Sequence, residues 1–186
     1  MNVFDAIANR RSIRKFTDRA PTRAELEQIL DAAALAPNHR LTHPWHFYVL
    51  GPEARAAYGL ALGNRKAKKA PDEAAADTVR RNTSDEHRAQ PCMLVVAMVQ
   101  SDNPEIREED YASAMMAVQN ICLAATALGL GTHIRSGAIM ADPAARAAVG
   151  VPDDQRIVAV LTVGSPVETP EPKTRRPAAE LTHWVA

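Results

Sequence analysis

Cysteine, aromatic residues and net charge are all scarce in this sequence, and each scarcity excludes a class of protein. Cys92 and Cys122 are the only cysteines, and both stand in apolar runs without the spacing of metal ligands. We therefore expect reduced core thiols in a cytoplasmic protein and no disulfide framework. The 22 basic residues balance 22 acidic ones, and aromatic residues make up 4% of the chain. No global electrostatic field is then available to recruit nucleic acid or an anionic membrane.

Long apolar segments and glycine-rich phosphate loops are also missing. No apolar stretch reaches the length of a membrane span, and charge follows the first apolar residues, the reverse of a signal peptide. Neither GxGxxG nor GxxxxGK(S/T) occurs, which argues against a dinucleotide-binding fold and a P-loop enzyme. The length suits one domain, spanning residues 1–186, that buries a substantial core.

Apolar periodicity predicts alternating helices and strands. Thr22 and Glu25 form a capping box, so a helix is expected to begin there. Residues 92–100 are almost continuously apolar, as is typical of a central strand buried on both faces. Small and apolar residues occupy almost every face between Ala112 and Leu128, and we expect this longest helix to be buried nearly all round. Other helices are predicted within residues 3–9, 52–62 and 141–152, and other strands at 45–51, 132–139 and 156–166.

Two polar segments interrupt this pattern. Residues 63–90 are charged and weakly patterned, so we expect a mobile lid or an irregular excursion there. The tail, residues 167–186, is proline-rich and polar until Leu181 and Trp184, with too few apolar residues for a core of its own. We expect it to wrap over a surface, which a second subunit could supply. The order of the other elements predicts an α+β or α/β sandwich around one sheet.

Four cations lie within six positions in RRSIRKF, where Arg10, Arg11, Arg14 and Lys15 surround Ser12. Three interpretations are open: a solvated turn, a nucleic-acid patch and a dedicated anion site. The nucleic-acid patch fits poorly, because the chain is neutral and no aromatic residues alternate with the cations. Arginine forks bind phosphate with two parallel hydrogen bonds, and a serine hydroxyl adds a neutral donor. A second cluster favours the anion site, because two separated clusters can clamp one phosphate: Lys173, Arg175 and Arg176.

Five segments, taken in order, make the chain similar to a known family. They are RRSIRKF, APNHRLTHPWHF, the helix end GLGTHIRSGAI, the strand and turn VLTVGSP, and the final KTRRP. Together they resemble the FMN-dependent nitroreductase family, in particular its short YdjA-like subgroup. The resemblance covers essentially the whole chain and implies a three-layer α/β/α sandwich around a central mixed sheet. It also implies an intertwined homodimer with FMN at the interface, in which residues 167–186 wrap the partner.

The resemblance assigns flavin-binding roles to both basic clusters. Arg10 and Ser12 would contact the FMN phosphate and ribityl chain, and Arg11 would supply backbone or stacking contacts. Arg14 would lie near the pyrimidine edge of the ring, where a fixed positive charge raises the reduction potential of the flavin. A solvated basic tail is the alternative for the two residues that match the family's C-terminal phosphate-binding pair, Lys173 and Arg175.

Three other segments match positions that contact flavin or nicotinamide in the family. One loop would approach the flavin ring from the partner subunit, with contacts from Leu35, Pro37, Asn38 and His39. One turn would direct its backbone amides toward the flavin N5, a position that favours hydride acceptance there, at Ile134, Arg135, Ser136 and Gly137. One helix end would bind the nicotinamide nucleotide, with a plain buried helix as the alternative: Ala124, Ala125, Thr126, Ala127, Leu128 and Gly129.

The chain departs from the family's common pattern at three positions. Leu41 and His43 stand where Asn and Gln are usual, and Ser136 stands where many relatives have Glu. Substrate contacts of the larger family members therefore do not carry over to these positions.

The implied function is an oxidoreductase with non-covalent FMN. NAD(P)H would reduce the flavin, and a second substrate would take the electrons in the same pocket, a ping-pong scheme that needs no catalytic side chain and no metal. Implied acceptors are nitroaromatics, quinones or activated alkenes. A flavin-binding or flavin-storage protein without turnover is the main alternative, and a specialised oxidase on the same fold is another. Lys66, Lys68 and Lys69 could favour NADPH over NADH, with a solvated face as the alternative.

Overall fold

The sheet is built around two neighbouring strands with long apolar runs. β2 (Met93–Val99) and β4 (Gln155–Gly164) pair antiparallel at its centre. β1 (Trp45–Leu50) lies beyond β2, and β3 (Gly131–Arg135) lies beyond β4, so the strand order is β1-β2-β4-β3. This computed structural model describes residues 1–185. Continuous apolar strands are expected where helices cover both faces of a sheet.

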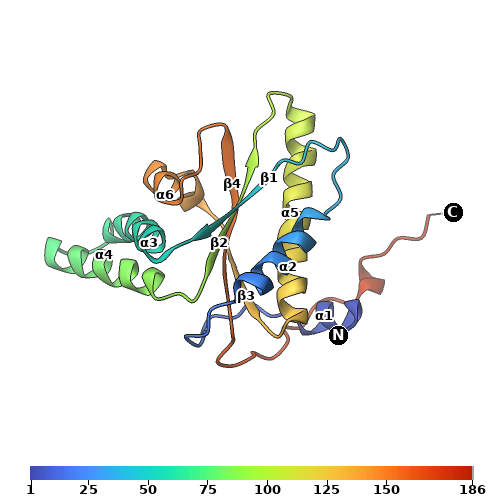
Figure 1. Cartoon of the computed structure of the whole chain (residues 1–186), viewed down its shortest axis with the longest axis horizontal. Helices are drawn as coiled ribbons and strands as arrows, with labels where there is room; N and C mark the ends of the chain where they lie inside the picture. The colour runs from blue at the N-terminus through green and yellow to red at the C-terminus, as the bar shows by residue number, and fades with distance from the viewer. Residues whose placement is uncertain (186) are drawn as a thin grey trace.

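Helices cover both faces of this sheet (Figure 1). α2 (Arg23–Ala34) and α5 (Pro104–Ala127) form the layer on one face, and α1 (Val3–Asn9) contacts α5. None of the helices in the described part of the chain combines the length and apolar character that crossing a membrane requires.

The opposite layer consists of α3 (Pro52–Ala67), α6 (Pro143–Val149) and α4 (Glu73–Arg88), which packs against α3. The expected three-layer α/β/α sandwich is thereby confirmed. All strand ladders are antiparallel, and the parallel pairing among residues 1–185 is limited to an isolated bridge between Ser12 and Thr132.

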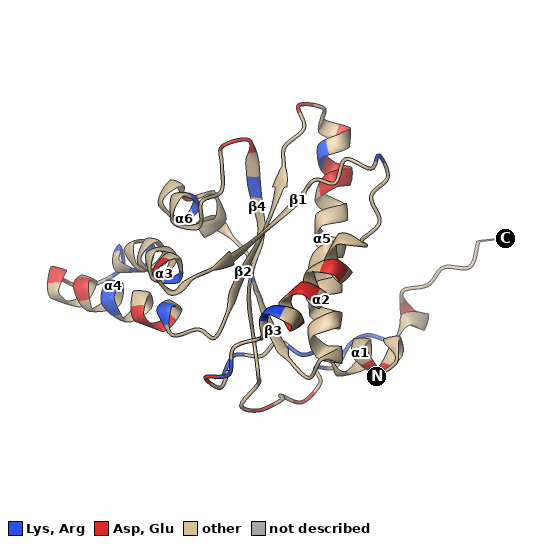
Figure 2. Cartoon of the chain, in the orientation of Figure 1, with Lys and Arg blue, Asp and Glu red and all other residues tan. Residues whose placement is uncertain are grey.

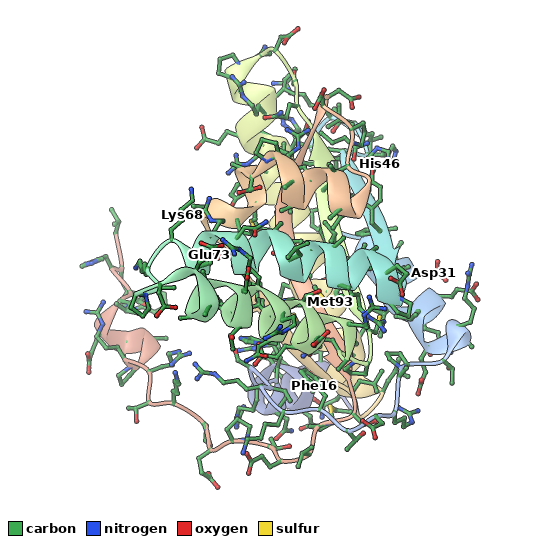
Figure 3. All side chains as sticks on the ribbon, turned by 90° about the vertical axis from the view of Figure 1, so that its left-hand side faces the viewer. Phe16, Asp31, His46, Lys68, Glu73 and Met93 are labelled. Carbon is green, nitrogen blue, oxygen red and sulfur yellow. The ribbon has the colours of Figure 1, made fainter. Side chains whose placement is uncertain are left out.

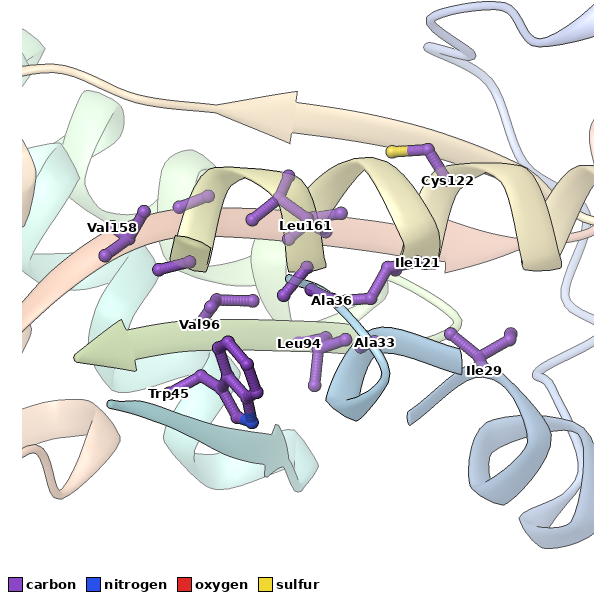
Figure 4. Packing of buried hydrophobic residues seen from close by; sticks show 14 of the residues in the cluster. Ile29, Ala33, Ala36, Trp45, Leu94, Val96, Ile121, Cys122, Val158 and Leu161 are labelled. Carbon is purple, nitrogen blue, oxygen red and sulfur yellow. The ribbon is translucent and has the colours of Figure 1, made fainter. Parts of the chain in front are cut away.

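Two apolar clusters, one on each face of the sheet, hold the layers together. On the α2/α5 side, Leu94 and Val96 of β2 pack with Ile121 of α5 (Figure 4). On the other side, Met93 and Val95 pack against α3 and α6. Successive side chains of a strand point to opposite faces, so β2 contributes alternately to both clusters.

Most predicted elements are confirmed, and the start of α2 shows why. The Thr22 amide donates to the Glu25 carboxylate at 2.7 Å, and the Glu25 amide donates to the Thr22 hydroxyl at 3.2 Å. This reciprocal cap satisfies two backbone donors at the helix start. α3 continues to Ala67 and does not end near residue 62.

The prediction of an irregular excursion at residues 63–90 is wrong. Most of it is regular helix, with a turn between α3 and α4 that Lys68 and Glu73 mark in Figure 3. The Asp72 carboxylate accepts from the Ala75 amide at 2.8 Å and caps α4. Thr83 is buried against α3, so the polar surface of α4 conceals a packed inner face. A lid function for this helical pair stays a prediction.

The expectation that α5 is buried nearly all round is also wrong for the single chain. Its inner face is buried at small residues such as Ala114 and Ala117, but Tyr111 and Met116 on the outer face are exposed. The tail from 167 to 185 is exposed along its whole length, and its end projects away from the sheet on the α1 and α5 side (Figure 1).

A buried polar cluster lies between α3, α4 and the sheet. Tyr58 and His87 are at least 95% buried, with ring centroids 5.8 Å apart. His87 Nδ1 lies 2.8 Å from the Thr83 carbonyl oxygen, whereas His87 Nε2 and the Tyr58 hydroxyl have no partner among residues 1–185. Burial lowers the pKa of His87 below its ordinary 6.5; the Thr83 hydrogen bond opposes this effect, and the charge of Arg135 adds to it.

This cluster predicts a stability that depends on pH. Below about pH 6.5 the unfolded chain takes up a proton that buried His87 resists, so the free energy of unfolding should fall as the pH decreases. His87→Asn keeps a donor near Thr83 and cannot titrate, and it should flatten this decline. Urea unfolding at about pH 7.5, 6.5 and 5.5 measures the slope.

His46→Asn, at an exposed position on β1, is the matched control for this measurement. In His87→Asn, the free energy of unfolding should still fall somewhat as the pH decreases, because burial also lowers the pKa of His133. Equal slopes in the wild type and His87→Asn would contradict the assignment.

Candidate functional site

The RRSIRKF segment lies directly along the edge strand β3. Ser12 pairs with Thr132, and the Ile13 amide donates to the Thr132 carbonyl at 2.9 Å. A Cβ atom at Gly131 would lie 2.5 Å from the Ile13 side chain, closer than real Cβ contacts come. Glycine at position 131 therefore permits the close approach of the segment to the sheet.

The same segment also contacts the start of the tail. The Thr17 amide donates to the Ser165 carbonyl at 2.9 Å, and the Val167 amide donates to the Lys15 carbonyl at 3.1 Å. The tail therefore leaves β4 beside RRSIRKF, and the two ends of the sequence become neighbours.

Residues of both predicted basic clusters line one cavity of about 660 Å³, which we call the basic cavity. Arg176 of the second cluster is not part of this lining. Figure 2 marks basic residues in blue along the segment between α1 and α2. Six cationic residues of the lining outnumber two acidic ones, so the cavity is strongly positive in a neutral chain. Its charged and polar lining residues are Arg10, Arg11, Ser12, Arg14, Lys15, Glu168, Glu171, Lys173 and Arg175.

Some cations of the basic cavity already make hydrogen bonds or ion pairs within the chain, and others do not. Arg11 Nη1 donates to the carbonyls of Ala8 at 2.6 Å and of Arg10 at 3.0 Å, and so caps the C-terminal end of α1. Lys15 lies 3.4 Å from the Glu168 carboxylate, in an exposed pair. Arg10, Arg14 and Lys173 make no ion pair among the described residues, which leaves their charges available to an anion.

A second cavity, of about 460 Å³, lies where β3 ends, and we call it the turn cavity. Ser136 and Gly137 line it, as predicted positions of the turn. Gly137 has φ 120° and ψ −168°, a backbone conformation that residues other than glycine rarely adopt. Thr132 pairs with Ser12 of the basic cavity, and Ser136, directly after β3, lines the turn cavity. These two residues are four positions apart, which is about 13 Å at the usual rise of a strand. The two cavities therefore lie at opposite ends of β3.

The Arg135 side chain lines neither cavity, so the predicted contact of this residue with the flavin N5 depends on its backbone amide alone. Alternation along β3 directs it to the α3 and α4 face, where Arg135 Nη1 donates to the Thr162 hydroxyl at 2.6 Å. Burial lowers the pKa of this guanidinium. Its neighbour Ile134 points to the opposite face and stays 36% exposed.

The loop at residues 35–43 lies against α5 and lines neither cavity in the single chain. Asn38 Nδ2 lies 3.3 Å from the Ser113 hydroxyl, and the Thr42 hydroxyl donates to the buried Asp110 carboxylate at 2.5 Å. The network holds Leu41 and His43 at φ near +50°, which is strained for residues other than glycine. The remaining predicted positions of this loop are exposed: Leu35, Pro37 and His39.

The helix end predicted to bind nicotinamide also lies outside both cavities. Ala125 is fully buried, so its side chain has no access to a ligand, and the Thr126 hydroxyl donates to the Cys122 carbonyl at 2.8 Å. Ala127, Leu128 and Gly129 are exposed.

Several lining residues of the turn cavity had no signal in the sequence. Arg156 opens the apolar run of β4, Tyr111 lies on α5 and Gln155 precedes Arg156, so no motif joins them. Glu168 and Glu171 of the basic cavity had a weak signal, since they stand beside the predicted cations of the tail.

Comparison with known proteins agrees with this architecture. The family model described as Nitroreductase family matches residues 7–165. The chain belongs to the nitroreductase family. YfhC of Bacillus subtilis is 32% identical over 173 residues, covering 93% of this chain and 89% of the relative. YdjA of Escherichia coli K12 is 34% identical over 166 residues, covering 89% of each. The names of both relatives assign them provisionally to the NAD(P)H nitroreductases.

Solved structures share the fold over the whole chain. A nitroreductase-like protein of Bacillus cereus superposes with a TM-score of 0.86 at 31% identity, covering 100% of this chain and 96% of the other. A protein of Desulfovibrio desulfuricans that is provisionally named a nitroreductase, solved in complex with FMN, superposes with a TM-score of 0.73 at 28% identity, covering 100% of this chain and 98% of the other.

The contact at Gly131 predicts a specific steric effect. Gly131→Ala should push Ile13 away from β3 and lower the free energy of unfolding by about 1–3 kcal/mol. Ile13→Ala alone should also destabilise, by about 2–4 kcal/mol, because a buried side chain is lost. In the double variant, the free energy of unfolding should fall by less than the sum of the two single effects, because the added methyl group occupies the space that Ile13 vacates. Denaturant unfolding of all four proteins measures the coupling, and simple additivity would contradict the close contact.

Proposed function

We propose that this nitroreductase-family chain is an FMN-dependent oxidoreductase that takes electrons from NAD(P)H and passes them to an electron-poor acceptor. One observation carries the proposal: the two basic clusters, from opposite ends of the sequence, line one cavity beside β3. A neutral chain that concentrates six cations around one cavity is suited to bind a multiply charged anion.

The residues of the basic cavity fit the phosphate of FMN. A phosphate monoester carries close to two negative charges at neutral pH and three acceptor oxygens. Arg10, Lys173 and Arg175 would supply charge-assisted donors, and the Ser12 hydroxyl a neutral one. Arg11 would contribute mainly through its position, because it already caps α1.

The turn at the other end of β3 fits the flavin ring. FMN, when bound, supplies reversible two-electron chemistry at its ring. The backbone of Ser136 and Gly137 is open to the turn cavity, and a Cβ atom at position 137 would meet nothing within 4 Å. Arg14 would place a fixed positive charge beside the pyrimidine edge and favour the reduced, anionic state.

The overall reaction balances without an acid–base pair from the protein. NAD(P)H gives up a hydride, which is two electrons and one proton, and becomes NAD(P)+. A nitro group that receives these and one further proton from water becomes a nitroso group and releases water. Quinones and activated alkenes are alternative acceptors. We propose a ping-pong order, in which NAD(P)+ leaves before the acceptor enters.

We further propose a homodimer that completes the site. Apolar side chains are exposed on the α1 and α5 side of the single chain, among them Phe4, Leu35 and Met116. The loop that holds Pro37, Asn38 and His39 lines neither cavity of its own chain, so it is available to a partner's site. The tail at 167–186 would wrap this partner. Cys92 and Cys122 are buried free thiols, which supports a cytoplasmic location.

The proposal predicts a visible flavin spectrum that NAD(P)H bleaches. The purified protein, supplied with FMN, should retain about one FMN per chain, and anaerobic titration with NADH or NADPH should remove the absorbance. Adding a nitroaromatic or a quinone should restore it.

Bound flavin that neither donor bleaches would favour a flavin-storage protein instead. A protein that binds no FMN would overturn the cofactor assignment. A monomer that keeps one FMN per chain would contradict the dimer alone.

The position of Arg14 predicts an effect on both affinity and potential. Arg14→Ala should raise the Kd for FMN about ten-fold and lower the reduction potential of the bound flavin, because a cation near the reduced ring is lost. Arg14→Lys should restore the potential in part. Arg81→Ala, on the exposed face of α4, is the control. Unchanged affinity and potential in Arg14→Ala would remove this residue from the site.

A further inference from the structure

Arg135 is the last residue of the edge strand β3, and the turn that lines the turn cavity begins directly after it. β3 ends opposite Val160, whereas β4 already begins at Gln155. The strand pairing on this side of β4 therefore stops at Arg135, and it does not hold the residues that follow.

The turn after Arg135 makes few contacts of its own. Ser136, Gly137 and Ala138 are exposed, and Ile139 is the next buried side chain. The amides of Ser136 and Gly137 donate no hydrogen bond within the described chain. The position of these amides therefore depends on how firmly the chain is held on either side of them, at Arg135 and at Ile139.

The Arg135 side chain holds its end of the turn from the far face of the sheet. Its Nη1 donates to the Thr162 hydroxyl at 2.6 Å, and Thr162 is fully buried. Thr162 lies opposite His133, so the guanidinium reaches it diagonally across the two strands. Diagonal neighbours on one face of a sheet are about 7–8 Å apart, a distance that a long side chain spans. An apolar side chain could not make this directional contact.

The surroundings of the guanidinium leave it this one contact. No carboxylate lies within ion-pair distance of Arg135 among residues 1–185, and Glu86 acts on its charge only from a greater distance. Burial lowers the pKa of His87 and of His133, and the charge of Arg135 adds to this effect, so both imidazoles are mainly neutral at pH 7. The Thr162 hydroxyl is the one acceptor that the Arg135 side chain uses in the described chain. No competing group draws it away.

We propose that Arg135 is a positioning residue whose side chain, anchored at Thr162, fixes the free amides of Ser136 and Gly137 where a flavin N5 accepts a hydrogen bond. The proposal rests on the proposed function, which places the flavin ring at this turn. The side chain lies under the α3 and α4 layer, on the other side of β3 from the turn cavity. It therefore acts on the geometry of the turn and does not touch the flavin.

An electrostatic role is the alternative for Arg135, because a positive charge near the turn would favour the reduced, anionic flavin. The two roles require different things of Thr162. An electrostatic role needs the guanidinium alone, whereas an anchor also needs the hydroxyl that accepts its hydrogen bond. Substitutions at Thr162 therefore separate the two roles.

The test follows the hydrogen bond at the flavin itself. Protein loaded with FMN that carries 15N at N5 gives an NMR signal whose position reports whether N5 accepts a hydrogen bond. Arg135→Met and Thr162→Val should each move this signal toward that of a flavin without a hydrogen bond there. Arg135→Lys should restore it in part, and Thr162→Ser, which keeps the hydroxyl, should keep the wild-type signal. Arg81→Met, at an exposed position of α4, is the control.

Three further measurements separate this effect from a general loss of structure. The Kd for FMN should stay near the wild-type value, because the phosphate contacts lie in the basic cavity. Anaerobic bleaching by NADH or NADPH should slow about ten-fold or more, as expected for a misplaced reacting group. In the double variant Arg135→Met/Thr162→Val, the free energy of unfolding should fall by less than the sum of the two single effects, since neither polar group is left without its partner. The N5 signal should nevertheless stay shifted in this double variant.

Each other outcome overturns a stated part of the scheme. An N5 signal that returns to the wild-type position in the double variant means that packing alone is needed, and it overturns the anchor. A wild-type signal in Thr162→Val with a shifted one in Arg135→Met assigns an electrostatic role and also overturns the anchor. Unchanged N5 signals in every variant, with normal bleaching, overturn the anchor and leave the reductase function standing. The expected N5 signals without any bleaching support the anchor and overturn the reductase function. A protein that binds no FMN overturns both.

Discussion

The hydrogen bond from the Ile13 amide to the Thr132 carbonyl is the constraint on which both ends of the site depend. It forms because Gly131 leaves room for Ile13 against the edge strand. The segment it holds presents Arg10, Ser12 and Arg14 to one cavity and guides the first residues of the tail past them. The tail begins beside this segment, because the Val167 amide donates to the Lys15 carbonyl, and the two basic clusters therefore lie together although like charges repel.

One short strand organises everything that follows from this contact. At its start, β3 pairs with RRSIRKF and builds the basic cavity. At its end, β3 stops short of the beginning of β4, and the turn cavity fills the uncovered edge. Alternation along the same strand sends Arg135 inward, where it meets Thr162 below the α3 and α4 layer. A single element thus sets the spacing of the two cavities and also connects them to the core.

Short sequence patterns predicted helices and strands well where neighbouring residues alone determine the structure. The Thr22 and Glu25 cap and the continuous apolar run of β2 are patterns that neighbouring residues satisfy among themselves. α4 escaped prediction because its buried face consists of small and polar residues, including Thr83 and His87, that have no apolar period. The composition of α5 suggested burial on all sides, but a single chain covers one face of it, and composition does not say whether a second chain covers the other.

The sequence by itself determined the fold class, the two basic clusters and the family resemblance, because each lies in short runs of residues whose chemistry is visible in order. The tertiary structure alone decided that the clusters meet in one cavity, that Arg135 turns away from it, and that Arg156 and Tyr111 stack beside the turn. These outcomes depend on strand register and on the unequal lengths of β3 and β4. The paired residues are far apart in the chain, and the pattern of one strand alone does not say which residue of another strand lies opposite it.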